Sequence, residues 1–194
     1  MAKVFFSFFF TLCFFHLSAY AEAVPKAALT FDFNVRMFQM SRMKEEKILD
    51  AVELLRKVFV SAEFKQRILN HQFYGKKKFL KNKGLSNLEI YNLILSGVEQ
   101  LHPYRNNAMD LDVQLYTDYH STVLGFTRPN TGRIWINSKY FNRHSPARIA
   151  ENLMHEWLHK VGFDHDYRQT RDRKYSVPYA IGYIVGELAA RMDD

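Results

Sequence analysis

The sequence predicts one α+β domain, because it contains segments with the periodicity of a β-strand and, separately, segments with the periodicity of a helix. Apolar and polar residues alternate from residue 29 to residue 37, as in a strand with one buried face. Residues 43–70 and 146–161 instead repeat apolar residues at intervals of three and four, which is typical of amphipathic helices. There is no internal repeat, low-complexity tract or linker, so a chain of 194 residues is expected to hold one compact domain.

The domain is expected to begin with a strand and two or three helices. The residues that share the apolar face of the strand are Leu29, Phe31, Phe33, Val35 and Met37. The helical segment 43–70 is expected to break near Ser61, giving two helices. Ser86 and Glu89 have the spacing of a capping box, in which each side chain bonds to the backbone of the other residue. The helix that they open is expected to run to about Leu101.

Three further strands are predicted before the second long helix. Residues 113–117 alternate in polarity, and residues 122–127 and 133–137 have strand-like compositions. Residues 129–132 (Pro-Asn-Thr-Gly) are typical of a turn and would connect the last two strands.

Ser145 and Pro146 predict the start of the second long helix, with serine as the N-cap and proline at the first helical position. The residues spaced as its buried face are Ile149, Leu153, Trp157 and Val161. Residues 180–192 are apolar enough to form a packed C-terminal helix.

The first residues are typical of a secretory signal peptide. Lys3 is followed by an apolar stretch over residues 4–17 and by two A-x-A patterns, with cleavage expected after Ala21 or Ala23. The apolar stretch is short for a membrane span, although an uncleaved N-terminal anchor remains the alternative. We therefore expect a signal peptide over residues 1–23 and a secreted or periplasmic domain over residues 24–194, with no stable membrane span after cleavage.

Cysteine content and charge restrict the partners of this domain. The only cysteine, Cys13, lies in the predicted signal peptide, so the mature chain would have no disulfide bond. The net charge is +7. The densest basic run consists of Lys76, Lys77, Lys78, Lys81 and Lys83. Such a run is either a solvated loop or a surface that attracts an anionic partner, and an exported protein is not expected to bind nucleic acid. We expect a monomer.

One short segment indicates chemistry. It reads H-E-x-x-H-x-x-G-x-x-H and comprises His155, Glu156, His159, Gly162 and His165. Two histidines four residues apart project from one face of a helix, and the glycine can end that helix and return the third histidine to the same point. Three imidazoles are a typical ligand set for Zn²⁺ and leave one coordination position open, as in catalytic zinc sites. The alternative is an amphipathic helix with histidines on its exposed face.

The same residues suggest hydrolysis. A zinc ion with an open position acidifies a bound water, and Glu156 is placed to act as general base towards it. A carbonyl carbon of a peptide bond, or of another amide, would be the target.

The complete motif resembles the signature of the metzincin clan of zinc metallopeptidases, and Asp166 after the third histidine is similar to the astacin-type form. This resemblance implies a metzincin-like zincin: a small mixed sheet, an active-site helix and a C-terminal helix. It also implies that an edge strand, here residues 122–127, binds an extended peptide. Residues 175–179 resemble the tight turn that carries a methionine beneath the metal in that clan, with Pro178 in its place.

The resemblance gives further residues conditional roles. Tyr179, just after that turn, is either an extra ligand or oxyanion donor, or a packed tyrosine. Asp164 and Asp166 either orient a ligand imidazole or pair with Arg168 or Arg171. The remaining histidines are expected at the surface or in the cleft, for His120 and His144, or in structural positions, for His71 and His102.

These expectations combine into an exported zinc metallopeptidase that acts on a protein or peptide substrate. Two alternatives remain open: a zinc amidase or other hydrolase acting on cell-wall material, and a non-catalytic zinc-binding protein of the same fold. Glu156 favours a hydrolase, because a purely structural zinc site needs no base.

Overall fold

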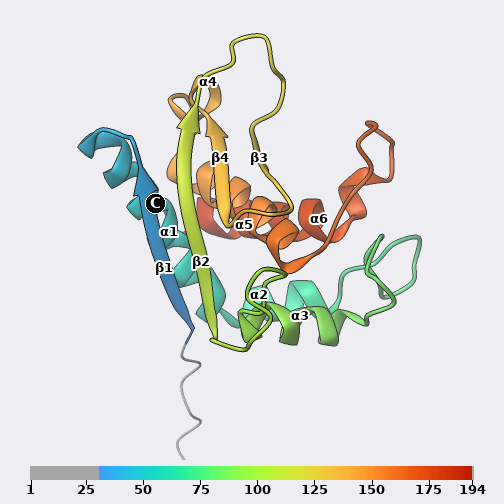
Figure 1. The fold of residues 1–194 in the computed structure, drawn as a ribbon. Coiled ribbons are helices and arrows are strands. Elements are labelled where there is room, and N and C mark those ends of the chain that lie inside the picture. Colours follow the sequence, from blue (N-terminus) through green and yellow to red (C-terminus); the bar gives the residue numbers. More distant parts are fainter. Residues whose placement is uncertain (1–30, 194) are drawn as a thin grey trace, which may run out of the picture.

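The computed structural model describes residues 31–193 (Figure 1). The predicted signal peptide, Cys13 and the predicted start of the first strand at Leu29 lie outside the described residues. Within the described range, no helix combines the length and the apolar character needed to cross a membrane.

The described chain is an α+β fold with a four-stranded mixed sheet in the order β1-β2-β4-β3. The strands are β1 (Asp32–Phe38), β2 (Ala108–Tyr116), β3 (Gly125–Thr127) and β4 (Arg133–Asn137). Strands β1, β2 and β4 are parallel, whereas the edge strand β3 runs antiparallel to β4. The sequence prediction for β4 is confirmed, and β2 is longer than predicted.

The predicted strand over residues 122–127 is wrong at its start, because β3 comprises only Gly125–Thr127. Before it, the Asp118 carboxylate accepts hydrogen bonds from the backbone N–H groups of His120 (2.9 Å) and Ser121 (3.0 Å). This local turn holds the preceding chain in a loop, since an aspartate that bonds its own backbone competes with strand pairing.

The described helices are α1 (Arg42–Val60), α2 (Ala62–Leu69), α3 (Asn87–Ser96), α4 (Ser138–Phe141), α5 (Pro146–Val161) and α6 (Val177–Ala190). The break near Ser61 is confirmed: its hydroxyl donates to the Val58 carbonyl (2.7 Å) and accepts from the Phe64 N–H (3.1 Å). The capping box of Ser86 and Glu89 is also confirmed.

The predicted extension of α3 to Leu101 is wrong. Helix α3 ends at Ser96, and Gly97 follows with φ of 67° in the left-handed region. A Cβ at Gly97 would lie 2.5 Å from backbone atoms of Ala108 at the start of β2, so only glycine allows this close approach.

Helix α5 begins as predicted, with the Ser145 hydroxyl accepting from the Arg148 N–H (3.3 Å). On its predicted inner face Ile149, Leu153 and Trp157 are buried, whereas Val161 is only half-buried. Helix α6 begins at Val177, three residues before the predicted start, and packs closely along α5.

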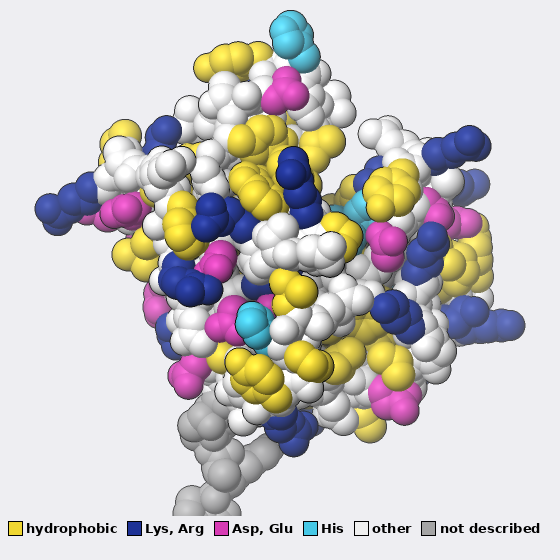
Figure 2. All heavy atoms as spheres, in the orientation of Figure 1, with side chains coloured by type: hydrophobic (Ala, Val, Ile, Leu, Met, Phe, Trp, Pro, Cys, Tyr) yellow, Lys and Arg dark blue, Asp and Glu magenta, His cyan; other side chains and the backbone are white. Residues whose placement is uncertain are grey.

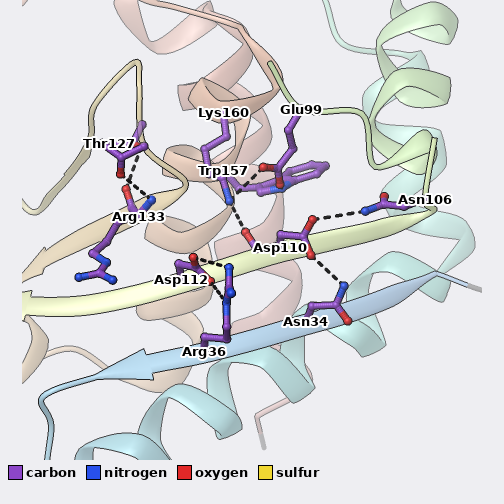
Figure 3. A network of polar contacts seen from close by, with 11 residues as sticks. Asn34, Arg36, Glu99, Asn106, Asp110, Asp112, Thr127, Arg133, Trp157 and Lys160 are labelled. Carbon is purple, nitrogen blue, oxygen red and sulfur yellow. Dashed lines mark hydrogen bonds and ion pairs between the residues drawn. The ribbon is translucent and has the colours of Figure 1, made fainter. Parts of the chain in front are cut away.

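Two layers enclose the core. Helices α1 and α5 cover one face of the sheet, behind the strands in Figure 1. On β2 the side chains of Met109, Leu111 and Val113 are buried against these helices. The opposite face carries polar side chains on β1 and β2, where Asp112 pairs with Arg36 at 2.6 Å (Figure 3), and aromatic side chains towards β3, where Phe126 stacks on Trp135. The sheet therefore presents one face to the core and the other to solvent.

Candidate metal centre

The three motif histidines converge on one point. His155 and His159 lie one turn apart on α5, and Gly162, with φ of 109°, ends the helix so that the chain returns His165 towards them. The ligand nitrogens of the three lie within 4.8 Å of one another, close enough to hold one metal ion. The sequence prediction that these three side chains meet is confirmed.

Each imidazole is held through a backbone carbonyl. His159 donates through Nδ1 to the Phe163 carbonyl (2.8 Å), and His165 through Nδ1 to the Asp166 carbonyl (3.1 Å). His155 makes a backbone hydrogen bond with Pro178, whose only backbone hydrogen-bonding group is its carbonyl. Such bonds fix the tautomer and leave the other ring nitrogen as the free donor to a metal.

The donor set fits a small tetrahedral ion. The Nε2 atoms of His155 and His165 are 3.2 Å apart. Two nitrogens bound to a tetrahedral Zn²⁺ at the usual bond length would be separated by about 3.3 Å. The spacing in the structure is therefore already close to that of a ligated pair.

The electrostatics of the site favour neutral imidazoles. Burial lowers the pKa of His155 well below its ordinary value, and it lowers the pKa of His165 to about 4. Burial also lowers the pKa of His159, against the opposing hydrogen bond to Phe163. Neutral imidazole is the form that binds a metal, so the free ring nitrogens are available near neutral pH.

Glu156 lies between α5 and the edge strand β3. Its side chain is 4 % exposed, and burial raises its pKa to about 8. Hydrogen bonds from the Asn152 side chain and the Thr127 backbone oppose that rise. The carboxyl group is therefore held in a fixed position beside the histidines, in surroundings that favour uptake of a proton.

Tyr179 lies against the histidines. Its ring centroid is 4.4 Å from that of His155 and 4.8 Å from that of His165. Residues 175–179, predicted as a tight turn, are instead the last residue of a 3₁₀ turn (Arg173–Tyr175), the N-cap Ser176 and the start of α6. Pro178 is in the first turn of this helix, where its fixed φ is compatible with helical geometry.

The two aspartates after the glycine have different partners. The Asp164 carboxylate accepts from the His165 N–H (2.7 Å) and lies 4.0 Å from Nδ1 of His159, so it borders the ligands. The Asp166 carboxylate pairs with Lys81 at 2.5 Å. Of the two roles left open for Asp166, pairing with Arg168 or Arg171 is not what the structure has, because Lys81 of the basic run pairs with it instead.

The histidines face a cleft of about 990 Å³. It is bordered by β3 on one side and by the segment between α5 and α6 on the other, and Figure 2 shows a notch in the surface there. The lining includes Thr127 and Asn152 beside Glu156, and Lys83 and Arg173 on the opposite wall. The charge of Arg173 also lowers the pKa of Tyr179, against the larger effect of burial.

Other histidines stay apart from this centre. His120 and His144 are outside the cleft lining; His120 is exposed, and His144 lies beside Tyr140. The structural position predicted for His71 is confirmed: its ring stacks on Phe79 at 4.1 Å, and burial lowers its pKa to about 4. The same expectation for His102 is wrong, because its side chain is exposed.

Sequence reasoning missed Asn152, Lys83 and Arg173 as cleft residues. Asn152 is four residues before Glu156 on α5, so helical spacing could have indicated it. Lys83 and Arg173 come from segments that meet the histidines only in the folded chain, and no local pattern marks them.

No protein-family model matches this sequence, and no curated protein is similar enough to be identified as a relative. The function of this protein is therefore inferred from its own residues.

Proposed function

We propose that this protein is an exported zinc metallopeptidase of metzincin-like fold that hydrolyses peptide bonds. The observation that carries the proposal is the cluster of three histidines with free ring nitrogens, beside the buried carboxyl group of Glu156 and open to a cleft. A structural zinc site would close the fourth position with another ligand, whereas this cluster borders a space large enough for a peptide.

In the proposed hydrolysis, the histidines, Glu156 and Tyr179 would have different roles. When bound by the three histidines, a zinc ion would supply Lewis acidity that acidifies a water and polarises a carbonyl. Glu156 would accept the proton of the attacking water and pass it to the leaving amine, because its carboxyl group is next to the histidines and lines the cleft. Tyr179, whose ring lies against His155 and His165, would donate to the developing oxyanion.

The edge strand supports a peptide as the substrate. Strand β3 pairs with β4 on one side only, and its residues line the cleft. An extended peptide could add to such an edge through main-chain hydrogen bonds. The parallel strands followed by α5, with β3 antiparallel at the edge, are consistent with the mixed sheet that the metzincin resemblance implies. Export is proposed from the sequence of residues 1–23 alone.

Glu156→Gln gives the sharpest test. The purified zinc-loaded chain is incubated with a mixed library of unstructured peptides, and new termini are read by mass spectrometry. We expect cleavage by the wild type and at least a hundredfold less by Glu156→Gln, with one zinc per chain retained in both, because glutamine cannot take up the proton. Equal cleavage by the two proteins would remove Glu156 from the base role. Absence of cleavage with zinc bound would contradict peptidase activity on unstructured peptides.

A further inference from the structure

Arg173 is a cation on the cleft wall that the proposed mechanism does not use. It opens the 3₁₀ turn before α6, and its guanidinium lies 4.6 Å from the centre of the Tyr179 ring. Tyr179 in turn contacts His155 and His165. Arg173 and the two histidines therefore contact the same aromatic ring.

Within residues 31–193, Arg173 has no carboxylate partner within 4.0 Å, and its buried Nε atom has no hydrogen-bond partner. The other charged pairs that line the cleft are complete: Arg148 pairs with Glu151, and Lys160 with Glu99. A partly buried guanidinium without an anion has lost hydration and gained no ion pair. It has donors left for a ligand that brings negative charge.

The acidic residues closest to Arg173 along the chain are already engaged. Asp172, its direct neighbour, accepts a hydrogen bond from the Tyr74 hydroxyl (2.9 Å). Asp166 pairs with Lys81. Both partners, Tyr74 and Lys81, come from residues 74–83, which include the basic run, so these two carboxylates are engaged by that segment.

The basic run also adds a positive charge to the cleft. Leu80 donates from its backbone to the Tyr175 carbonyl (2.8 Å), which fixes the run against the 3₁₀ turn of Arg173. Lys83, three residues later, lines the cleft itself. Of the five lysines of the run, which are all exposed, Lys83 therefore contributes to the cleft wall. Figure 2 shows lysine and arginine side chains around the notch.

We propose that Arg173, assisted by Lys83, forms a subsite that binds a carboxylate of the substrate next to the metal centre. The inference rests on the proposed function for the identity of the substrate. A planar guanidinium can bind a carboxylate through two parallel hydrogen bonds, and the lysine adds a point charge. The carboxylate can belong to an acidic side chain or to the C-terminus of a peptide.

Equilibrium binding tests this subsite without turnover. The probes are alanine-based heptapeptides that are acetylated and amidated and carry one glutamate, placed at each position in turn. In the matched neutral peptides glutamine replaces the glutamate. One further glutamine peptide is left without the C-terminal amide, so that its only carboxylate is the C-terminus. Binding to zinc-loaded Glu156→Gln is measured by titration calorimetry. We expect at least one carboxylate peptide to bind ten times or more tighter than its neutral counterpart. The glutamate and free-terminus arms separate the two sources of the carboxylate.

Variants then assign the preference. Arg173→Gln in the Glu156→Gln background should reduce it to less than twofold, whereas Arg171→Gln, which changes an exposed arginine outside the cleft lining, should retain it. Lys83→Gln changes an exposed loop side chain and should reduce the carboxylate preference about threefold. This variant still tests the subsite if Arg173→Gln does not fold. No carboxylate preference, or a preference that survives either cleft variant unchanged, would overturn the proposed subsite.

The two proposals can fail separately. Cleavage of the library without carboxylate preference would refute the subsite and leave the peptidase intact. A carboxylate preference that depends on Arg173, in a protein that cleaves no peptide, would refute the peptidase and leave the subsite intact.

Discussion

Helix α5 carries polar side chains on two flanks, and the two differ in how their polar groups are satisfied. On the flank away from the histidines, here called the buried flank, Lys160 lies 3.1 Å from Glu99, and these side chains are 5 % and 1 % exposed. The Trp157 indole donates to the same carboxylate (2.6 Å), and Lys160 also donates to the Asp110 carbonyl (Figure 3). The charges of this buried flank are neutralised within the protein.

On the flank that carries the histidines, here called the cleft flank, each imidazole has only one of its two ring nitrogens bonded to the protein backbone. His155 and His159 each use one ring atom on a backbone carbonyl and leave the other towards His165 and the cleft. Groups that are paired within the protein contribute to folding, whereas positioned groups with a free lone pair indicate a ligand. The comparison therefore predicts that substitutions on the two flanks affect different properties: zinc binding on one and stability on the other.

The largest expected effect is on the cleft flank. His159→Ala should weaken zinc binding at least a thousandfold, about 4 kcal/mol, because it removes one of three ligands. The metal-free protein should lose only about 1 kcal/mol of unfolding free energy, since one hydrogen bond to the Phe163 carbonyl is lost. Competition with a chelator measures the affinity, and urea unfolding measures the stability.

His120→Ala is the matched control, because it removes an exposed histidine outside the cleft lining. We expect it to leave zinc affinity and stability unchanged. Stoichiometric zinc retained by His159→Ala at the wild-type affinity would exclude His159 from the ligand set.

A substitution on the buried flank should lower stability and leave zinc affinity almost unchanged. Lys160→Met should lower the free energy of unfolding by about 3 kcal/mol, because it leaves the Glu99 carboxylate buried without its cation. Zinc affinity should change less than threefold, since the histidines keep their own backbone partners. Urea unfolding of the metal-free protein checks the first effect, and the chelator assay checks the second.

A double variant separates the charge from the packing at this pair. Glu99→Gln combined with Lys160→Met removes both charges, and we expect it to recover at least half of the lost stability. If the double variant lost as much unfolding free energy as Lys160→Met alone, the destabilisation would come from the lost packing of the lysine side chain and not from the unpaired carboxylate.

Local patterns were sufficient where the signal and the structure lie in the same few residues. The N-cap at Ser145, the capping box at Ser86 and Glu89, and strand β4 were all predicted correctly. The convergence of the three histidines also follows from helical spacing and one glycine. The pattern that predicts each of these features lies within fewer than a dozen consecutive residues.

Contacts between distant segments were not predictable in this way. Trp157 and Glu99 are 58 positions apart, and their hydrogen bond depends on how α5 packs against the loop after α3. The early end of α3 depends on Gly97 meeting β2, a contact that only the tertiary structure creates. The same holds for Arg173, whose 3₁₀ turn is bonded through the Tyr175 carbonyl to the distant residue Leu80.

The smallest expected effect concerns Pro178, which connects the cleft flank to α6. His155 is bonded to the backbone of Pro178, and a backbone carbonyl survives any substitution of the side chain. Pro178→Ala should therefore change zinc affinity less than threefold. It should lower stability by about 1 kcal/mol, because the unfolded chain gains freedom when the proline ring is removed. Thermal unfolding with and without zinc measures both effects. If zinc affinity instead fell more than tenfold, the proline ring itself would be needed to position His155, and the cleft flank would depend on packing as much as the buried flank does.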